Sequence, residues 1–167
     1  MSDPARRQLA ALAGVDERFT EAHVDYWLFG GWAVDFNTGT VTRPHDDVDI
    51  AVWFDDVMRI AELLEADGWS HAPDPDEDGG TGYERDGVRL ELTFLVRLED
   101  GGVYMPFRHG HVRWPDGALP GGTLELLGTR ARVVRFTALA EMKSSPREDE
   151  LDAAKDRADF QLLRPSA

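Results

Sequence analysis

The sequence predicts a fold of the α+β or mixed α/β class, because it combines strand patterns with helix patterns in one chain. In GVRLELTFLV (87–96), apolar and polar residues alternate, which is typical of a strand. In residues 56–67, apolar residues recur at helical spacing. The chain has 167 residues, about the length of one domain. We therefore expect a single domain over residues 1–167, with a core at about 20–100 and a C-terminal strand and helices at about 124–164.

The other elements follow from the same signals. One or two helices are expected at 4–22, where Gly14 can interrupt the apolar stripe. In the helix at 56–67, either Asp55 or Asp56 suits the N-cap and Gly68 suits the C-terminal cap. We expect further strands at 24–29, 48–54 and 130–136, loops at 71–82 and 100–123 (the second with short strand pieces), and helices at 137–143 and 148–163.

The composition limits the classes of partner and compartment. The chain has 32 Asp and Glu against 18 Lys and Arg, a net charge of -14, which disfavours a polyanion such as nucleic acid and attracts small cations. The alternative is an acidic surface that only aids solubility. Without cysteines, the protein has no disulfides and no thiolate metal sites. We expect a cytoplasmic protein with no membrane partner, because neither a membrane-spanning run nor a signal-peptide pattern is found.

Two aspartates stand in a strand that otherwise has the composition of a buried one. At a period of two, Asp47 and Asp49 point to the same face of the strand, roughly 6 to 7 Å apart. Two anions this close need a cation to offset their repulsion. Glu91 lies on the polar face of the strand at 87–96, so it can join them if the two strands pair, giving a two-metal site for displacement at phosphorus. The alternative is a solvated strand face.

A glycine pair and a short basic segment precede these acids. Gly30 and Gly31 follow the strand at 24–29 and are expected to form a turn whose backbone N–H groups approach a phosphate. Arg43 and His45 either contact phosphates or hold the loop in place. For His45, packing within the loop is as good an explanation as a functional role.

These residues resemble a known family. The segment YWLFGGWAVDFNTGTVTRPHDDVDIAV resembles the small antibiotic nucleotidyltransferases of the DNA polymerase β-like superfamily, in particular lincosamide nucleotidyltransferases and aminoglycoside 2''-adenylyltransferases. The resemblance continues through the helix at 56–67, the strand around Glu91 and KDRADFQLL (155–163), so it covers most of the chain. One departure concerns Glu91, because the third acid of these relatives is usually aspartate.

The resemblance implies a polymerase β-like fold, with a mixed twisted sheet flanked by helices. It also implies that ATP or another NTP is held at Gly30 and Gly31, and that Asp47 and Asp49 bind Mg²⁺. Glu91 would complete the metal site, act as general base towards an acceptor hydroxyl, or both. The acceptor oxygen would then attack the α-phosphorus, and pyrophosphate would leave.

The transfer chemistry also requires cations for the phosphates. Arg43 is one candidate, and Lys143 and Lys155 on the late helices are others, with a plain surface role as the alternative for each lysine. Three residues of the last helix are spaced for ion pairs within that helix alone: Asp156, Arg157 and Asp159.

The acceptor is expected to be a small, hydroxylated cation such as an aminoglycoside or a lincosamide. The acidic loop DPDED (74–78) and the net charge suit such a molecule, and the alternative is that the loop is only solvated. Tyr104, Phe107 and Trp114 line an acceptor cleft or belong to the core. Two alternatives remain: a toxin-type or other nucleotidyltransferase acting on a protein or tRNA, and a degenerate nucleotide-binding protein. A monomer and a homodimer are both compatible with the sequence.

Overall fold

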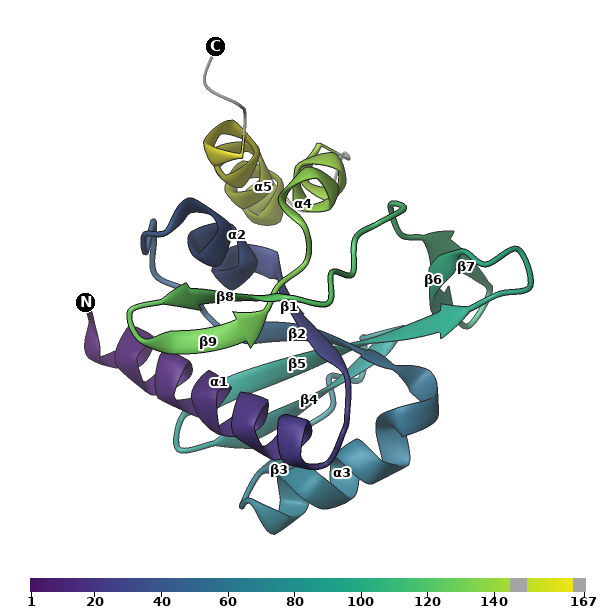
Figure 1. The fold of residues 1–167 in the computed structure, drawn as a ribbon, viewed down its shortest axis with the longest axis horizontal. Coiled ribbons are helices and arrows are strands. Elements are labelled where there is room, and N and C mark those ends of the chain that lie inside the picture. Colours follow the sequence, from purple (N-terminus) through teal and green to yellow (C-terminus); the bar gives the residue numbers. More distant parts are fainter. Residues whose placement is uncertain (145–149, 164–167) are drawn as a thin grey trace.

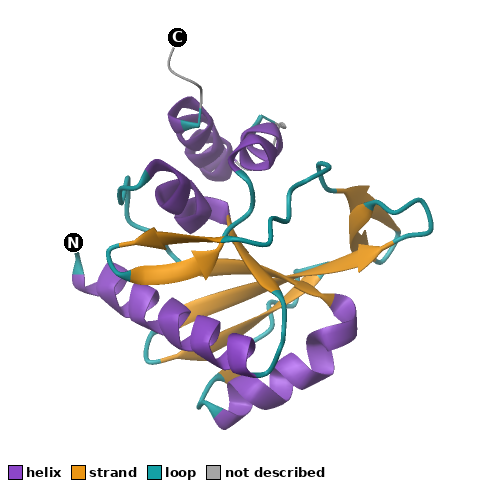
Figure 2. Cartoon of the chain, in the orientation of Figure 1, coloured by secondary structure: helices purple, strands orange, loops and turns teal. Residues whose placement is uncertain are grey.

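The structure, a computed structural model, describes residues 1–144 and 150–163. In the view of Figure 1, α2, α4 and α5 gather above the strands and α1 and α3 lie below them; Figure 2 shows the same division between helices and strands. The helices are α1 (Asp3–Glu21), α2 (Gly30–Thr38), α3 (Val57–Ala66), α4 (Phe136–Lys143) and α5 (Glu150–Leu162), with a 3-10 turn at Phe54–Asp56. The strands are β1 (Tyr26–Phe29), β2 (Val48–Trp53), β3 (Ser70–His71), β4 (Gly80–Arg85), β5 (Val88–Arg97), β6 (Val103–Phe107), β7 (Gly110–Arg113), β8 (Thr123–Leu126) and β9 (Thr129–Arg132).

The main sheet is mixed, as the sequence predicts. Its strands follow the order β1-β2-β5-β4-β3, and the β6–β7 hairpin extends from β5. The pair β2–β5 is parallel, whereas β1–β2 and β4–β5 are antiparallel. A parallel pair requires a crossover connection, and α3 lies within it. The strands expected at 48–54 and 87–96 are thus paired, which is the condition under which Glu91 can join the two aspartates.

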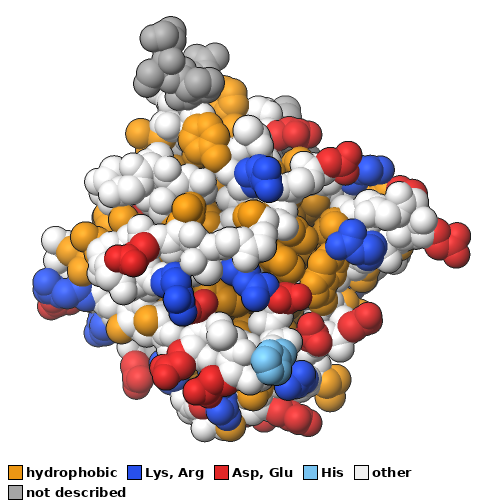
Figure 3. All heavy atoms as spheres, in the orientation of Figure 1, with side chains coloured by type: hydrophobic (Ala, Val, Ile, Leu, Met, Phe, Trp, Pro, Cys, Tyr) orange, Lys and Arg blue, Asp and Glu red, His pale blue; other side chains and the backbone are white. Residues whose placement is uncertain are grey.

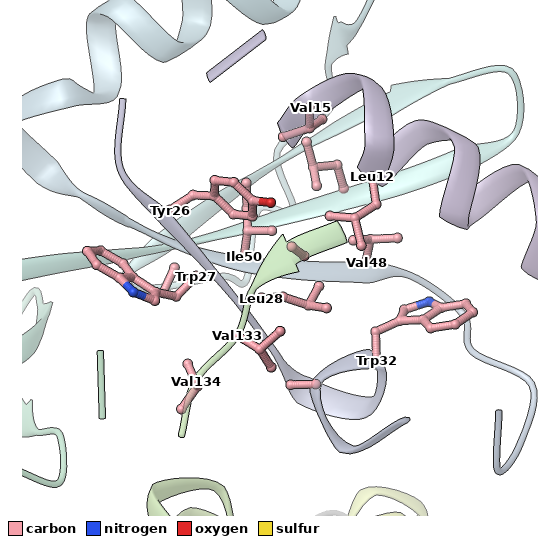
Figure 4. Packing of buried hydrophobic residues seen from close by; sticks show 14 of the residues in the cluster. Leu12, Val15, Tyr26, Trp27, Leu28, Trp32, Val48, Ile50, Val133 and Val134 are labelled. Carbon is pink, nitrogen blue, oxygen red and sulfur yellow. The ribbon is translucent and has the colours of Figure 1, made fainter. Parts of the chain in front are cut away.

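The core lies between the sheet and the helices that cover it. Figure 4 shows side chains of α1, β1, α2, β2 and the segment 133–134 packed together, among them Leu12, Leu28 and Ile50. These three side chains are almost completely buried. Burying apolar side chains of this size stabilises the fold by about 1.5 to 3 kcal/mol each. The strands that carry the acids are thus anchored on their opposite, apolar face.

The N-terminal helix is continuous, so Gly14 does not interrupt it. Ser2 caps the helix by accepting a hydrogen bond from the Ala5 backbone N–H. Leu12 and Val15 on either side of Gly14 are both buried, so packing outweighs the cost of about 1 kcal/mol for a glycine within a helix.

The boundaries of α3 agree with the sequence at one end only. Gly68 has φ +85°, which is the left-handed conformation expected of a glycine after a helix. Asp56 is the residue at the N-cap position, but its side chain makes no capping hydrogen bond because the preceding residues form the 3-10 turn. The prediction of a side-chain cap by Asp55 or Asp56 is therefore wrong in its mechanism.

The loop expected at 71–82 contains more strand than the sequence suggests, because it includes the end of β3 and the start of β4. The short strand pieces expected in 100–123 are present as the β6–β7 hairpin and the start of β8. The expected strand at 130–136 is shorter, because α4 begins at Phe136, and it pairs with β8 in a separate two-stranded sheet. The helix expected at 148–163 is α5; residues 145–149 lie outside the described residues.

Acidic and basic side chains are interspersed over the face drawn in Figure 3. In the described part of the chain, no helix has both the length and the apolar composition that a bilayer span requires.

Candidate active site

Asp49 and Glu91 lie side by side on one face of the sheet. Their Cα atoms are register partners in the parallel pair β2–β5, and on the other side of β2 the partner of Asp49 is Phe29 of β1. Residues opposite each other in paired strands point to the same face, and so does Asp47, two residues before Asp49. The sheet therefore brings the three predicted carboxylates to one face.

The glycine pair does not form the expected free-standing turn. Gly30 and Gly31 are the first two residues of α2, so their backbone N–H groups belong to a helix N-terminus. Gly30 has φ +67°, and a Cβ atom there would lie 2.2 Å from Oδ2 of Asp49. A Cβ atom at Gly31 would lie 2.5 Å from Nδ1 of His45 and 2.6 Å from Nη2 of Arg43. Only glycine lets the helix begin this close to these side chains.

A cavity of about 270 Å³ opens at this helix N-terminus. It brings together the predicted nucleotide-binding residues and two of the predicted acids. Its lining residues are Phe29, Gly30, Gly31, Arg43, His45, Asp46, Asp47, Asp49, Lys143, Asp152, Lys155 and Asp156. Glu91 is not among them, although it is the strand partner of Asp49. We call this cavity the phosphate pocket, because it joins a helix N-terminus with cationic side chains.

Burial and charge act together on the acids. Burial raises the pKa of Asp47, and the neighbouring Asp46 raises it further, while Lys155 opposes both effects. Burial also raises the pKa of Glu91, whereas its hydrogen bond from Arg89 lowers it. Oε2 of Glu91 is buried and has no hydrogen-bond partner. Both carboxylates thus lie where a cation or a proton would be favourable.

Within residues 1–144 and 150–163, no three His, Asp or Glu side chains are grouped closely enough to hold a metal ion. Asp47 and Asp49 both line the phosphate pocket, but one oxygen of Glu91 accepts a hydrogen bond from Arg89. The metal site made of these three acids stays a prediction.

His45 holds the loop before β2. Its Nε2 lies 2.6 Å from Oδ2 of Asp35, its Nδ1 lies 3.1 Å from the Arg43 guanidinium, and its ring packs on Trp32. The other oxygen of Asp35, which is fully buried, accepts hydrogen bonds from the backbone and the hydroxyl of Thr42. These contacts hold the loop in place; His45 also lines the phosphate pocket, and its contact with phosphates stays a prediction.

Asp35 was not singled out from the sequence, although it belongs to the GGWAVD motif. The signal was an acid within a run of apolar residues. A buried carboxylate of this kind must be hydrogen-bonded, and its partners come from the loop that leads into β2.

The three predicted phosphate cations are paired with acids. Lys143 lies 2.7 Å from Asp156 and 3.0 Å from Asp159, and Arg43 lies 3.2 Å from Asp159. Lys155 lies 3.0 Å from Asp46, in the loop before β2.

These ion pairs correct the expectation that Asp156, Arg157 and Asp159 pair only within their own helix. Asp156 and Asp159 are buried and join α5 to α4 and to the loop before β2, whereas Arg157 is exposed. The reason is tertiary packing, which turns these carboxylates towards the phosphate pocket rather than along their own helix.

One residue of the acidic loop reaches the site. Glu77 is half-buried, and its Oε2 is buried without a hydrogen-bond partner, like that of Glu91. Burial raises the pKa of Glu77, and the charge of Glu91 raises it further. The sequence could not separate Glu77 from its solvated neighbours, because all residues of DPDED suit an exposed loop.

A second cavity, of about 320 Å³, adjoins the phosphate pocket, and both are lined by Phe29, Gly30 and Lys143. Of the three candidate aromatics, only Trp114 lines it; Tyr104 and Phe107 do not. Its lining residues are Phe29, Gly30, Met105, Val112, Arg113, Trp114, Pro115, Leu139, Glu141, Met142 and Lys143. We call this cavity the apolar pocket.

Comparison with known proteins agrees with this geometry. The family model described as aminoglycoside-2''-adenylyltransferase matches residues 11–114, more than half of the chain. A 2''-aminoglycoside nucleotidyltransferase of Escherichia coli is 49% identical over 39 residues, which are 23% of this chain and 20% of that protein. A lincosamide resistance protein of Staphylococcus haemolyticus is 39% identical over 51 residues, 30% of this chain and 32% of that protein. The matches thus span a third or less of these curated relatives.

Two solved structures share the fold over most of their length. The lincomycin-bound lincosamide antibiotic adenylyltransferase LnuA superposes with a TM-score of 0.70 at 20% identity, covering 91% of this chain and 93% of that one. ANT(2")-Ia in complex with adenylyl-2"-tobramycin gives a TM-score of 0.73 at 19% identity, covering 94% and 87%. The fold is therefore that of the nucleotidyltransferases, and the match over residues 11–114 shows that the chain belongs to the aminoglycoside-2''-adenylyltransferase family.

Proposed function

We propose that this protein is an enzyme that transfers AMP from ATP, with Mg²⁺, to a hydroxyl group of a small cationic antibiotic of the aminoglycoside or lincosamide class. The observation that carries the proposal is the phosphate pocket. There, Asp47 and Asp49 face the glycine-led N-terminus of α2 and the cations Lys143 and Lys155. Nucleotidyl transfer needs these groups together, because they position the triphosphate and balance its charge.

The acids suit a divalent cation. Asp47 and Asp49 supply hard oxygen ligands, which Mg²⁺ prefers, and the raised pKa of Asp47 indicates an unmet need for positive charge. Asp47 and Asp49 would hold the ion, with Glu91 as the third ligand if its oxygen leaves Arg89. When bound, Mg²⁺ would neutralise charge on the triphosphate and on the leaving pyrophosphate.

Glu91 would act as the general base. It neighbours Asp49 on the face where the α-phosphorus would lie, and its pKa, which burial raises above that of an ordinary glutamate, suits a group that takes up a proton. It would accept the proton of the acceptor hydroxyl while the oxygen attacks the α-phosphorus and the bond to pyrophosphate breaks. Arg89 would hold Glu91 in its orientation through the hydrogen bond to Oε1.

A cationic acceptor is supported by the charge beside Glu91. Glu77 and Glu91 each keep a buried carboxylate oxygen without a hydrogen-bond partner, and an ammonium group would satisfy both. The net charge of -14 would add long-range attraction for a polycation.

The test is to incubate the protein with Mg²⁺, all four NTPs and a mixed panel of aminoglycosides and lincosamides, and to analyse the products by mass spectrometry. We expect one antibiotic to gain the mass of one AMP, which identifies donor and acceptor together. A reaction without Mg²⁺ serves as control and should give no product. If ATP binds but no antibiotic is modified, the acceptor class is wrong, and labelled NTP with protein or tRNA acceptors tests the alternative. If ATP does not bind in titration calorimetry, the chain is a degenerate member of its family.

A further inference from the structure

We propose that Gln8 of α1 is a positioning residue for the acids that would bind the metal ion: its side-chain amide fixes the backbone of the loop before β2 and thereby sets the position of Asp47. This inference rests on the proposed function, since it requires Asp47 to hold a metal ion for nucleotidyl transfer. Gln8 lines neither the phosphate pocket nor the apolar pocket, so it would act through the loop and not by touching a substrate.

Gln8 is a polar residue on the buried face of α1. Leu12 follows it by four residues and Val15 by seven, so the three side chains share one face of the helix, and all three are buried. Figure 4 shows Leu12 and Val15 within the core. A buried amide is stable only when its hydrogen bonds are made, so the partners of Gln8 explain why this face carries a polar group.

The amide of Gln8 joins α2 to the loop before β2. Its Nε2 donates a hydrogen bond to the His45 carbonyl at 3.0 Å, and its Oε1 accepts one from the Trp32 indole at 3.2 Å. The carbonyl can only accept and the indole N–H can only donate, so one orientation of the amide satisfies both partners. Neither an ionised carboxylate nor an apolar side chain of the same length offers both functions.

The loop depends on such support because residues 41–47 form no helix or strand. Side chains hold it instead: the ring of His45 is hydrogen-bonded to Asp35 of α2, and the carbonyl of His45 is hydrogen-bonded to Gln8 of α1. His45 is therefore fixed at its side chain and at its backbone, from two different helices. Asp47 follows only two residues later, so a displacement of the His45 peptide would carry directly into its carboxylate.

Metal-binding side chains depend on the groups that hold them in place. Removal of such an outer partner lowers metal affinity or activity about 10- to 100-fold, because the ligand no longer lies where the ion requires it. Loss of the Gln8 hydrogen bonds should therefore weaken cation binding at Asp47 and lower kcat. The KM for the acceptor should change little, because Glu77 and Glu91, on the acceptor side, lie outside this loop.

The first test measures Mn²⁺ binding to the free protein by electron paramagnetic resonance, without nucleotide and without turnover. Gln8→Met keeps the length of the side chain but removes both hydrogen bonds, and we expect the Mn²⁺ affinity to fall about 10-fold. Gln8→Asn keeps the amide on a side chain one methylene shorter, which cannot hold both partners at these distances, so its loss should be intermediate. Thermal unfolding checks that each variant is folded.

The matched control is Tyr26→Phe. It removes another buried hydrogen bond of α1, from the Tyr26 hydroxyl to Asp16 at 2.7 Å, and Tyr26 is the register partner of Val52, at the opposite end of β2 from the loop. This variant should lower the unfolding temperature as Gln8→Met does, but it should leave the Mn²⁺ affinity unchanged.

The second test uses steady-state kinetics below the unfolding temperature of each variant. In Gln8→Met, we expect kcat to fall about 10-fold and the half-saturating Mg²⁺ concentration to rise, with the KM for the acceptor unchanged. Wild-type Mn²⁺ affinity and kcat in a folded Gln8→Met or Gln8→Asn protein would overturn the proposal, as would equal losses in Tyr26→Phe. If the wild type transfers no AMP while Gln8→Met still weakens Mn²⁺ binding, the proposed function fails and the positioning role stands, so the two ideas fail separately.

Discussion

The carboxylate of Asp49 occupies the space that a side chain at Gly30 would need: a Cβ atom built on Gly30 lies 2.2 Å from Oδ2. The first residue of α2 and the central acid of β2 are therefore packed against each other. This contact links the helix N-terminus that would receive the phosphates to the carboxylate that would receive the metal ion.

Gly30→Ala should lower both stability and activity. The residue has φ +67°, which costs an alanine about 1 to 2 kcal/mol, and its methyl group would displace Asp49. Gly87→Ala is the matched control, since Gly87 has φ +75° but no atom within 4 Å of the added Cβ. Thermal unfolding should show a similar loss of stability from backbone strain in both variants, whereas the transfer assay should show loss of activity only for Gly30→Ala. Equal activity of the two variants would contradict the link between Gly30 and Asp49.

Asp49→Asn should abolish adenylyl transfer and leave the fold intact. The amide keeps the shape of the side chain but loses the charge that would hold Mg²⁺, so we expect kcat/KM to fall by at least about 100-fold. Circular dichroism and thermal unfolding check the fold, and Asp55→Asn, in the 3-10 turn that follows β2, serves as the control. A folded Asp49→Asn protein with full activity would refute the metal site.

The pH profile should report on Glu91. Because burial raises its pKa, the carboxylate takes up a proton at a higher pH than an ordinary glutamate, and a protonated base cannot act. On the acidic side of the pH profile, kcat/KM should therefore begin to decline at a pH above the range in which glutamate usually titrates. Arg89→Met removes the hydrogen bond that lowers this pKa, so this decline should move to still higher pH. If Arg89→Met does not move the pH at which kcat/KM declines, or if Glu91→Gln still shows that decline, Glu91 is excluded as the base.

Lys143 and Lys155 should differ in their effect on stability. Lys143→Met removes one cationic partner from the buried Asp156 and Asp159, although Asp159 keeps Arg43, so we expect a loss of about 3 kcal/mol together with a higher KM for ATP. Lys155→Met breaks an exposed pair with Asp46, worth about 0 to 1 kcal/mol, so mainly the KM for ATP should rise. Denaturant unfolding and steady-state kinetics separate the two effects. An unchanged KM for ATP in both variants would assign these lysines to structure alone.

Asp35→Ala should destabilise the protein even though Asp35 does not line the phosphate pocket. The substitution leaves the hydroxyl and backbone N–H of Thr42 and one nitrogen of His45 without their partner, at a cost of about 3 kcal/mol. Denaturant unfolding measures this loss. Thr38→Ala, which removes the long hydroxyl contacts to the Asp35 and Thr40 carbonyls and leaves the Asp35 carboxylate in place, should have a much smaller effect.

The sequence by itself determined the two strands that carry Asp49 and Glu91. The alternation of Val88, Leu90 and Leu92 and the spacing of Asp47 and Asp49 are local patterns with a period of two, and the structure has both strands where these patterns predict them. The glycine pair also marked the right place, but local signals could not show whether a turn or a helix follows, because glycine permits both.

Only the tertiary structure decided which side chains meet. The partners of Lys143 and Arg43, the role of Asp35 and the approach of Glu77 to Glu91 all join residues that are distant in the sequence. The sequence has no periodicity from which the partner of a charged side chain could be identified. An exposed acid also has the same sequence pattern as a buried one. Burial, set by how α2, α4 and α5 pack over the sheet, selects among them, because a buried charge is stable only where the fold supplies its counterpart.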